Sequence, residues 1–170
     1  MRILPIIILI VASLATNAQV ADTKINSAFQ QEIEGYLNHS VPTISVQDAA
    51  KCARQTLFLD AREEDEFMIS HIPAAKYVGH KRFKRKNVEV LDRDTPIIIY
   101  CSIGYRSEKI GEKLLKMGFT NVHNLYGSIF EWANHGLPLE DSQGQPATAL
   151  HTYNKKWSKW VTNNNYTKVW

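Results

Sequence analysis

The sequence predicts an α/β fold in which a parallel sheet carries helices on both of its faces. The first observation behind this prediction is that strand-like and helix-like segments alternate along the chain, as they do in parallel sheets. The second is the run Pro96 to Tyr100, whose continuous apolar character is typical of a strand buried on both faces. With 170 residues and an ordinary composition, the chain suits one globular domain.

The first 18 residues have the pattern of a secretory signal peptide that is cleaved after Ala18. Met1-Arg2 is a short positive start, Ile3 to Val11 is strongly apolar, and Thr16-Asn17-Ala18 offers small residues before the cut. The alternative is an uncleaved anchor, although the apolar run is shorter than the roughly 20 residues of a comfortable membrane span. We therefore expect an exported protein, periplasmic in a bacterium, with no stable membrane span.

Residues 19–42 are predicted to form an amphipathic helix followed by a short linker at Val41-Pro42. Such a helix either packs against the domain as an added layer or binds a partner, and the width of its apolar stripe favours packing. The apolar positions at helical spacing are Ile25, Ala28, Phe29, Ile33, Tyr36 and Leu37.

The core domain is expected over residues 43–140, and its first half contains two helices and two strands. Ser45 is predicted to cap the first helix, with Asp48 at the third helical position. The elements are, in order, a helix at Val46–Gln55, a buried strand at Leu57–Asp60, a short acidic helix at Glu63–Ile69 and a strand at Ala75–Val78.

The second half of the core domain continues this alternation after the strand that ends at Tyr100. Ser128 and Glu131 match a capping box, which predicts a helix that starts at Ser128. Trp132 on that helix is most simply a core residue. The expected elements are a helix from Glu108 to Met117 with Gly118 as its stop, a strand at Val122–Leu125 and a last helix that ends near Gly136.

The last part of the chain, residues 141–170, is read as a linker and a basic aromatic tail. Asp141 to Thr148 is polar and is expected to be the linker. Residues 151–170 contain three tryptophans, two tyrosines and four lysines but no acidic residue. This tail either packs on the domain over the N-terminal helix, or forms an interface for a protein partner or an anionic membrane surface. Packing is favoured because apolar stripes are most often buried.

The candidate catalytic residue is Cys101, which directly follows the buried strand. The carboxyl ends of strands in an open α/β sheet form the edge where ligands bind. The next helix would direct its positive dipole end and free N–H groups toward the sulfur, which favours the reactive thiolate. The alternative is a buried structural cysteine beside a surface arginine. A glycine and an arginine within one strand-to-helix loop favour a cup for an anion, built by Ser102, Ile103, Gly104, Tyr105 and Arg106.

Charge and metal-binding patterns support no other class of site. The formal net charge is only +3, which gives no argument for a nucleic-acid partner. The six histidines are scattered without metal-ligand spacing, and two cysteines cannot form a zinc site alone, so no metal or cofactor is implied. The basic run Lys81–Lys86 is either a solvated loop or an electrostatic collar that attracts anionic substrates or an acidic partner.

Cys52 is the second cysteine of the chain and lies in the predicted helix Val46–Gln55. The simplest interpretation is a partly buried helix residue. An oxidising compartment would favour a disulfide where the geometry allows one. The sharper alternative is therefore a resolving thiol that pairs with Cys101.

Three stretches of the chain carry the signatures of one family. Cys101–Ser107 is similar to an active-site loop that a cysteine opens and Arg-Ser often closes. Residues 59–75 resemble an upstream signature of Asp-x-Arg, an acidic helix and Gly-His-Ile-Pro-Gly-Ala, and residues 124–138 resemble the closing signature. The chain therefore resembles the rhodanese-like sulfurtransferases over about residues 43–140, in order and with ordinary spacing.

The resemblance implies a roughly five-stranded parallel sheet with helices on both faces, to which this chain adds N- and C-terminal segments. It also implies that Asp60 and Arg62 support the site by charge-assisted hydrogen bonds that hold loops in place. The chain departs from the family at Ser70 and Ala74, where glycines are usual, and at Ser128, which replaces a second glycine. These positions lie outside the catalytic loop and bear on local turn geometry.

The activity implied by the resemblance is sulfur transfer through a persulfide on Cys101. The thiolate would attack the outer sulfur of a small anionic donor such as thiosulfate, and sulfite would leave. Cyanide or a thiol would then accept the sulfur, which predicts ping-pong kinetics. Amides from Ser102 to Arg106 would stabilise the persulfide, and Arg106 would help to bind the donor.

Two other functions stay open at this point. Phosphatases and arsenate reductases also place a cysteine in an anion-binding loop, but they have one residue more between the cysteine and the arginine. Here the four residues from Ser102 to Tyr105 separate the two, which argues against a phosphate substrate. A non-catalytic module that carries a persulfide or binds a partner would use the same residues as the enzyme.

Overall fold

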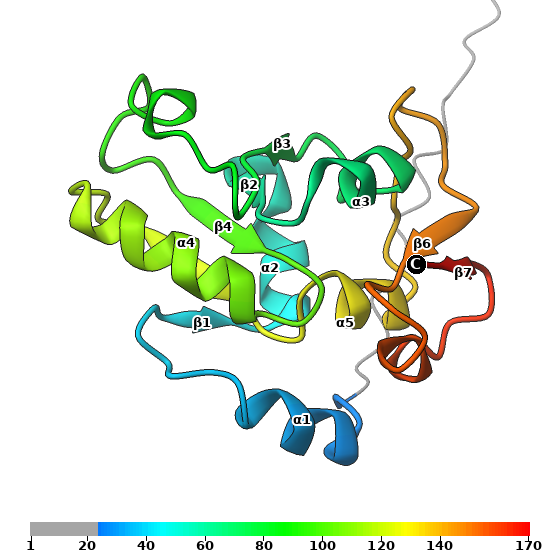
Figure 1. Cartoon of the computed structure of the whole chain (residues 1–170). Helices are drawn as coiled ribbons and strands as arrows, with labels where there is room; N and C mark the ends of the chain where they lie inside the picture. The colour runs from blue at the N-terminus through cyan, green and yellow to red at the C-terminus, as the bar shows by residue number, and fades with distance from the viewer. Residues whose placement is uncertain (1–23) are drawn as a thin grey trace, which may run out of the picture.

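The computed structural model describes residues 24–170, so the expected signal peptide lies outside the described residues. At its centre is a five-stranded sheet in the order β1-β5-β4-β2-β3, in which every neighbouring pair is parallel (Figure 1). The predicted α/β fold with a parallel sheet is thereby confirmed. The strands are β1 (Thr43–Ile44), β2 (Leu57–Asp60), β3 (Lys76–Tyr77), β4 (Ile97–Tyr100) and β5 (Val122–Leu125).

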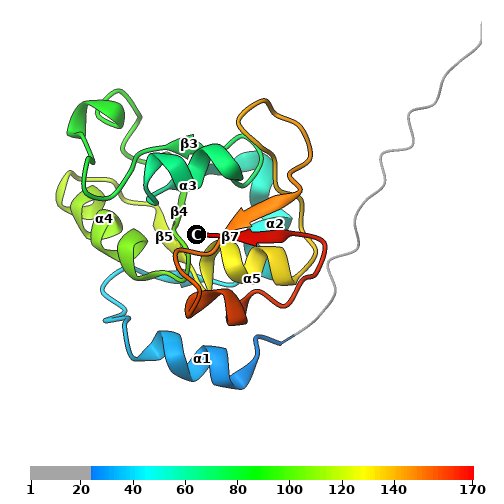
Figure 2. The same ribbon diagram turned by 45° about the vertical axis from the view of Figure 1, so that its right-hand side comes forward.

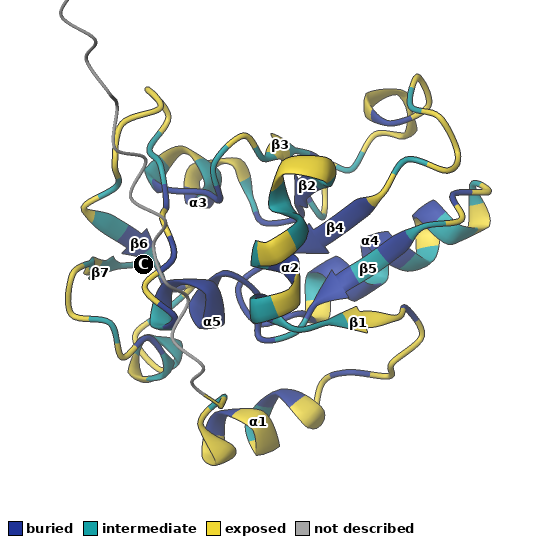
Figure 3. Ribbon diagram, turned by 180° about the vertical axis from the view of Figure 1, so that it is seen from behind, coloured by how far each residue is buried: buried dark blue, intermediate teal, exposed yellow. Residues whose placement is uncertain are grey.

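The central strand β4 is buried along its whole length (Figure 3), as its apolar run predicts. Because side chains alternate across a strand, its residues divide between two clusters. Ile97 and Ile99 pack with residues of helix α4 (Tyr105–Lys116), whereas Ile98 and Tyr100 pack with residues of α2 (Val46–Cys52) and α5 (Ser128–Asn134). The sheet therefore has helices on both faces.

The other helices are short, and local capping explains several of their limits. Ser45 accepts a hydrogen bond from the N–H of Asp48 (3.1 Å), as predicted for the start of α2. Asn26 accepts from two backbone N–H groups and caps α1, which runs from Ser27 to Glu34. The predicted helix runs from Gln19 to Asn38, and its residues 19–23 lie outside the described residues. The remaining helices are α1 (Ser27–Glu34), η1 (Ala53–Gln55), α3 (Glu64–Ile69), η2 (Arg85–Asn87) and η3 (Trp157–Trp160). No helix within residues 24–170 combines the length and apolarity needed to cross a bilayer.

The start of α4 and the capping of α5 differ from the prediction. Helix α4 begins at Tyr105 rather than near Glu108, because Gly104 adopts a φ of +119° and forms the N-cap. Helix α5 does begin at Ser128, but the predicted capping box is wrong. Gly127 is the N-cap, and Ser128 itself has a φ of +53°, so its hydroxyl is turned to other partners.

The C-terminal tail contains a second, two-stranded sheet that the sequence did not predict. Strands β6 (Ala149–His151) and β7 (Thr167–Val169) pair in parallel, and η3 lies between them and α1 (Figure 2). Trp160 stacks on Phe29 with ring centroids 5.3 Å apart. Leu150 and Val161 are fully buried in the cluster that contains α1 and α5. The tail therefore packs on the domain over the N-terminal helix.

Candidate active site

Cys101 follows β4 directly, at the carboxyl edge of the sheet, and is 1% exposed. The loop between strand and helix is only four residues long, from Cys101 to Gly104, because α4 starts at Tyr105. Within it, the positive φ of Gly104 turns its N–H toward the sulfur, and the N–H donates to Sγ over 3.2 Å. The nucleophilic atom therefore lies against the N-terminal end of α4, where unpaired N–H groups favour an anion.

The pKa of the Cys101 thiol lies below its ordinary value. Burial alone would raise this pKa. The positive charge of Arg106, the nearby hydroxyl and N–H of Ser107, and the N–H of Gly104 oppose burial and together outweigh it. The Cys101 thiol therefore loses its proton more readily than an ordinary cysteine, and the resulting thiolate is the nucleophilic form.

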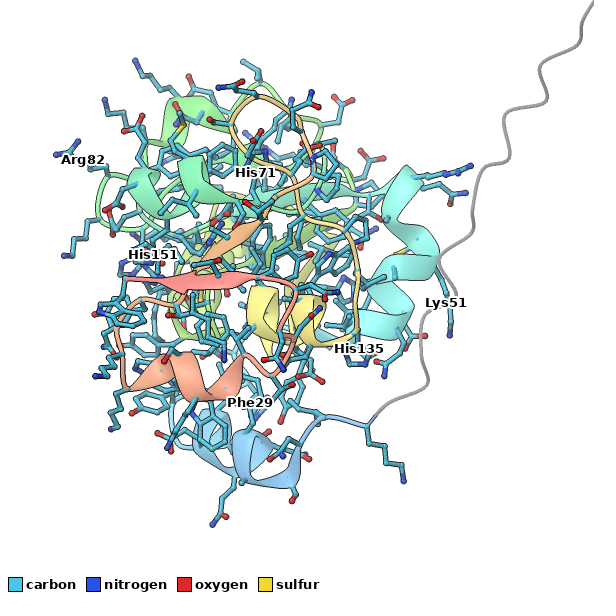
Figure 4. All side chains as sticks on the ribbon, turned by 90° about the vertical axis from the view of Figure 1, so that its right-hand side faces the viewer. Phe29, Lys51, His71, Arg82, His135 and His151 are labelled. Carbon is cyan, nitrogen blue, oxygen red and sulfur yellow. The ribbon has the colours of Figure 1, made fainter. Side chains whose placement is uncertain are left out.

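Arg106 stands in the first turn of α4 and is paired rather than free. Its two terminal nitrogens donate to the carboxylate of Glu66 on α3 over 2.5 and 2.8 Å, and one also donates to Ser102 Oγ over 2.8 Å. Burial would raise the pKa of Glu66, but the hydrogen bonds and charge of Arg106 lower it to about 2. His151 on β6 (Figure 4) adds a further group, with Nδ1 3.8 Å from Glu66 Oε1. No local sequence pattern pairs Glu66 with Arg106, because the two residues lie forty positions apart.

Asp60 and Arg62 form a fully buried pair at the end of β2. Arg62 donates from Nε and Nη2 to the Asp60 carboxylate, at 3.1 Å for Nε and 2.7 Å for Nη2. The same Nη2 reaches the carbonyl oxygen of Ser70 over 2.5 Å. The pair thus connects the end of β2 to the end of α3, the helix that carries Glu66, and it lies outside the cavity described below.

A second set of polar groups supports the loop from β5 and α5. Asn124 accepts from the Ser107 hydroxyl (2.7 Å) and donates to the carbonyl of Gly104 (3.0 Å). Ser128 Oγ accepts the N–H of Cys101 over 3.1 Å and donates to the carbonyl of Leu125. These contacts explain why the Ser128 hydroxyl does not cap its own helix. The local sequence does not predict these contacts of Asn124 and Ser128, because their partners lie on other elements.

A cavity of about 660 Å³ opens above Cys101. Its walls come from the catalytic loop, from the segment after α1, from the start of the basic run and from the C-terminal tail. Of the six residues Lys81–Lys86, only Lys81 lines it, and Arg82 points into solvent at the edge of the molecule (Figure 4). The lining residues are Gly35, Tyr36, Asn38, Glu63, His80, Lys81, Cys101, Ser102, Ile103, Tyr105, Arg106, Tyr153 and Trp157.

Cys52 lies far from this cavity. It lines a separate hollow with Pro96 and Ile97, at the start of β4, whereas Cys101 follows the end of the same strand. A disulfide needs Cα atoms within about 7 Å, and a four-residue strand spans about 13 Å. Both cysteines are free, and the alternative of a Cys52–Cys101 pair is wrong for this structure.

The site contains a candidate nucleophile and an anion-binding backbone but no recognisable metal centre. Within residues 24–170, no group of three or more histidine, cysteine, aspartate or glutamate side chains is placed to hold a metal ion. The geometry suits a reaction in which a negatively charged sulfur is formed and held by N–H groups.

This chain combines a parallel α/β sheet with a cysteine at the N-terminal end of an anion-binding helix. That combination is typical of proteins that hold a reactive thiolate at the end of a strand. The family model of the Rhodanese-like domain matches residues 45–135. This chain belongs to that family.

The chain is also similar to several curated proteins and solved structures. The tRNA uridine(34) hydroxylases of Pectobacterium carotovorum and Sodalis glossinidius are 37% and 35% identical over 94 and 95 residues, which is 50% and 51% of this chain. The matched part covers only 26% and 27% of those relatives. A rhodanese-related protein from Thermoplasma volcanium is 26% identical, with a TM-score of 0.53 over 58% of this chain and 96% of its own. A thiosulfate sulfurtransferase from Pseudomonas aeruginosa shares the fold at 24% identity, with a TM-score of 0.56 over 79% of this chain and 26% of its own.

Proposed function

We propose that this protein is a sulfurtransferase that carries sulfur as a persulfide on Cys101. The observation that supports this most directly is the placement of Sγ, 3.2 Å from the N–H of Gly104 at the start of α4, with a lowered thiol pKa. A persulfide anion formed there would replace the thiolate beside the same N–H groups. The reaction would therefore exchange one anionic sulfur for another within one binding cup.

In the first step the Cys101 thiolate attacks the outer sulfur of thiosulfate. A new S–S bond forms, the old one breaks, and sulfite leaves with its electron pair. In the second step cyanide or a thiol attacks the terminal sulfur, and the Cys101 thiolate is the leaving group. Ser102, Ile103 and Gly104 shape the cup around the sulfur, while Arg106 supplies the nearby positive charge that lowers the Cys101 pKa.

The test is the intact mass of the protein after incubation with thiosulfate. In a Cys52→Ser background, a gain of one sulfur atom that cyanide removes again is the expected result. The same protein with Cys101→Ser should gain nothing while keeping its circular dichroism spectrum. A gain that persists without Cys101, or no gain from either thiosulfate or polysulfide, would contradict the proposal.

Two alternative functions make different predictions. A phosphatase would hydrolyse an aryl phosphate, which the short loop before Arg106 argues against. A persulfide carrier would load one sulfur but release it to small acceptors no faster than a free persulfide does. The matched part spans only 26% of a tRNA uridine(34) hydroxylase, so the activity in that name is not carried over to this chain.

We also propose that the protein is exported, with cleavage after Ala18. The support is the positive start, the apolar run and the small residues before the cut. Expression in a bacterium followed by fractionation and N-terminal sequencing tests it. A periplasmic product that begins at Gln19 is expected, and a cytoplasmic product that begins at Met1 would contradict it.

A further inference from the structure

Three aromatic rings form a continuous wall beside the cavity above Cys101. Tyr105 and Tyr36 meet edge to face with centroids 6.4 Å apart, and Tyr36 meets Trp157 in the same manner at 5.5 Å. The rings come from α4, from the segment after α1 and from η3. Tyr153, near the end of β6, adds a fourth ring that lies under the guanidinium of Arg106 at 5.3 Å. We call these four residues the aromatic wall.

Most of the aromatic wall lies outside the matched domain. The family match covers residues 45–135, whereas Tyr36, Tyr153 and Trp157 belong to the terminal segments that this chain adds. Those segments are fixed in place by the stacking of Trp160 on Phe29 and by the buried Leu150 and Val161. The terminal segments therefore supply a defined surface to the cavity as well as an added layer of packing.

The charge of the cavity does not favour a small anion. Arg106 is already paired with Glu66 and covered by Tyr153 on one side. Lys81 lines the cavity and makes no ion pair with another described residue, but the carboxylate of Glu63 lines it too. A dianion such as thiosulfate would therefore meet little uncompensated positive charge on its way to Cys101.

The size of the cavity also suits a ligand larger than a small inorganic anion. Sites for organic ligands span about 300–1,000 Å³ and have mostly apolar and aromatic walls. The 660 Å³ above Cys101 lie within that range, while an inorganic sulfur ion would fill only a small part of it. Tyrosine and tryptophan faces stack well on flat apolar groups.

We propose that the sulfur partner of Cys101 is a small organic thiol with a flat, apolar body, together with its persulfide. This inference rests on the proposed sulfurtransferase function and names its substrate class. The thiolate of Cys101 attacks the outer sulfur of the organic persulfide, the S–S bond breaks, and the organic thiolate leaves and takes the persulfide proton. Cys101 then carries a persulfide anion, and total charge and oxidation state are conserved. The reverse reaction delivers the sulfur to the same thiol.

The test compares two thiols as acceptors. Protein with Cys52→Ser is loaded with thiosulfate or polysulfide, freed of excess donor, and mixed with benzyl mercaptan or 2-mercaptoethanol while the intact mass is followed. The ratio of the two discharge rates is compared between proteins, because the intrinsic reactivities of the thiols then cancel. The variants are Tyr36→Ala and Tyr153→Asn, whose side chains are partly exposed and whose loss should not disturb the core. Asparagine is chosen because residue 153 has a positive φ of 66°. Trp170→Ala removes an exposed aromatic ring that does not line the cavity and is the matched control.

The ratio should favour benzyl mercaptan in the starting protein and in Trp170→Ala, and should fall roughly tenfold when Tyr36 and Tyr153 are both changed. The Tyr153→Asn variant alone should show part of this fall, which preserves the test if the double variant does not fold. Normal loading with an unchanged ratio would overturn this inference and leave the sulfurtransferase proposal standing. Failure of every donor to load Cys101 would instead overturn the proposed function, and the inference with it.

Discussion

Glu66 and Cys101 both interact with the guanidinium of Arg106. Arg106 donates two hydrogen bonds to the Glu66 carboxylate, and its charge is the strongest single influence that lowers the Cys101 pKa. The carboxylate fixes the position of the guanidinium, since both side chains are nearly buried. The first turn of α4 thus supplies a positive charge whose position is set by α3.

The acidity of Cys101 leads to a prediction on pH dependence. In the Cys52→Ser protein, the rate of alkylation by iodoacetamide should reach its plateau at a lower pH than that of glutathione, whose thiol is ordinary. Ser107→Ala should move the profile to higher pH, because the Ser107 hydroxyl helps to lower the Cys101 pKa. The pH–rate profile of alkylation measures both shifts. A Cys101 profile that coincides with that of glutathione, or lies at higher pH, would show that burial offsets the groups that lower the Cys101 pKa.

Glu66→Gln should destabilise the fold by about 3 kcal/mol, because it leaves a nearly buried guanidinium without its countercharge. The pKa of Glu66 is about 2 in the folded protein and near 4.5 when unperturbed. The pair therefore contributes fully above about pH 5, and its contribution is lost as the pH falls toward 2. Urea unfolding at pH 7 and pH 3 should show a gap between variant and starting protein that narrows at pH 3.

The exposed neighbour Glu64 provides the control, since Glu64→Gln removes an equal charge from the same helix. The free energy of unfolding of this variant should lie within about 0.5 kcal/mol of that of the starting protein. If both substitutions lower the free energy of unfolding equally, the ion pair of Glu66 with Arg106 adds no stability beyond that of a negative charge on α3.

At the scale of elements, local chemistry predicted some boundaries well and others not at all. The cap of α2 by Ser45 depends on residues three apart and was predicted correctly. The start of α4 depends on the φ of Gly104, and the role of Ser128 depends on its contact with Cys101 across the sheet. Such features depend on backbone torsion and on distant partners, which periodicity does not contain.

Ser128 joins α5 to the catalytic loop, and this leads to a second stability prediction. Ser128→Ala should cost about 2 kcal/mol, because the buried N–H of Cys101 loses its acceptor. Ser128→Gly removes the same acceptor but suits the positive φ better, so it should cost less than the alanine variant. Urea unfolding and the rate of sulfur loading should be measured together. Equal stability of both variants and the starting protein would exclude Ser128 as a support of the loop.

At the scale of the whole molecule, the sheet and the Cys101 loop could be predicted from the sequence, whereas the cavity above Cys101 could not. A buried strand such as Ile97–Tyr100 can be predicted from its own continuous apolar run. Strands β6 and β7 have three residues each and are only partly buried, so no pattern marks them. The wall residues Tyr36 and Trp157 lie 121 positions apart, which is 157 minus 36, and meet only in the fold.

The two terminal segments hold each other on the face of the sheet that carries α2 and α5. Trp160 lies at the centre of this contact, because it stacks on Phe29, which is 1% exposed. The backbone carbonyl of Trp160 also accepts a hydrogen bond from Asn134 of α5, at 2.9 Å. A side chain that stabilises this contact should therefore affect the stability of the molecule and the shape of the cavity together.

Trp160→Ala should lower the free energy of unfolding by about 3 kcal/mol, because it opens a space beside Phe29 and removes the stacked pair. Trp160→Phe keeps a ring in contact with Phe29 and should recover more than half of that loss. Trp170→Ala, at an exposed position outside the contact, should change stability by less than about 0.5 kcal/mol. Urea unfolding measures the stability of all three variants.

If the terminal segments hold each other in this way, Trp160→Ala should also weaken the preference for benzyl mercaptan without preventing sulfur loading. Unfolding curves of Trp160→Ala and Trp170→Ala that coincide would mean that the tail covers the domain without stabilising it.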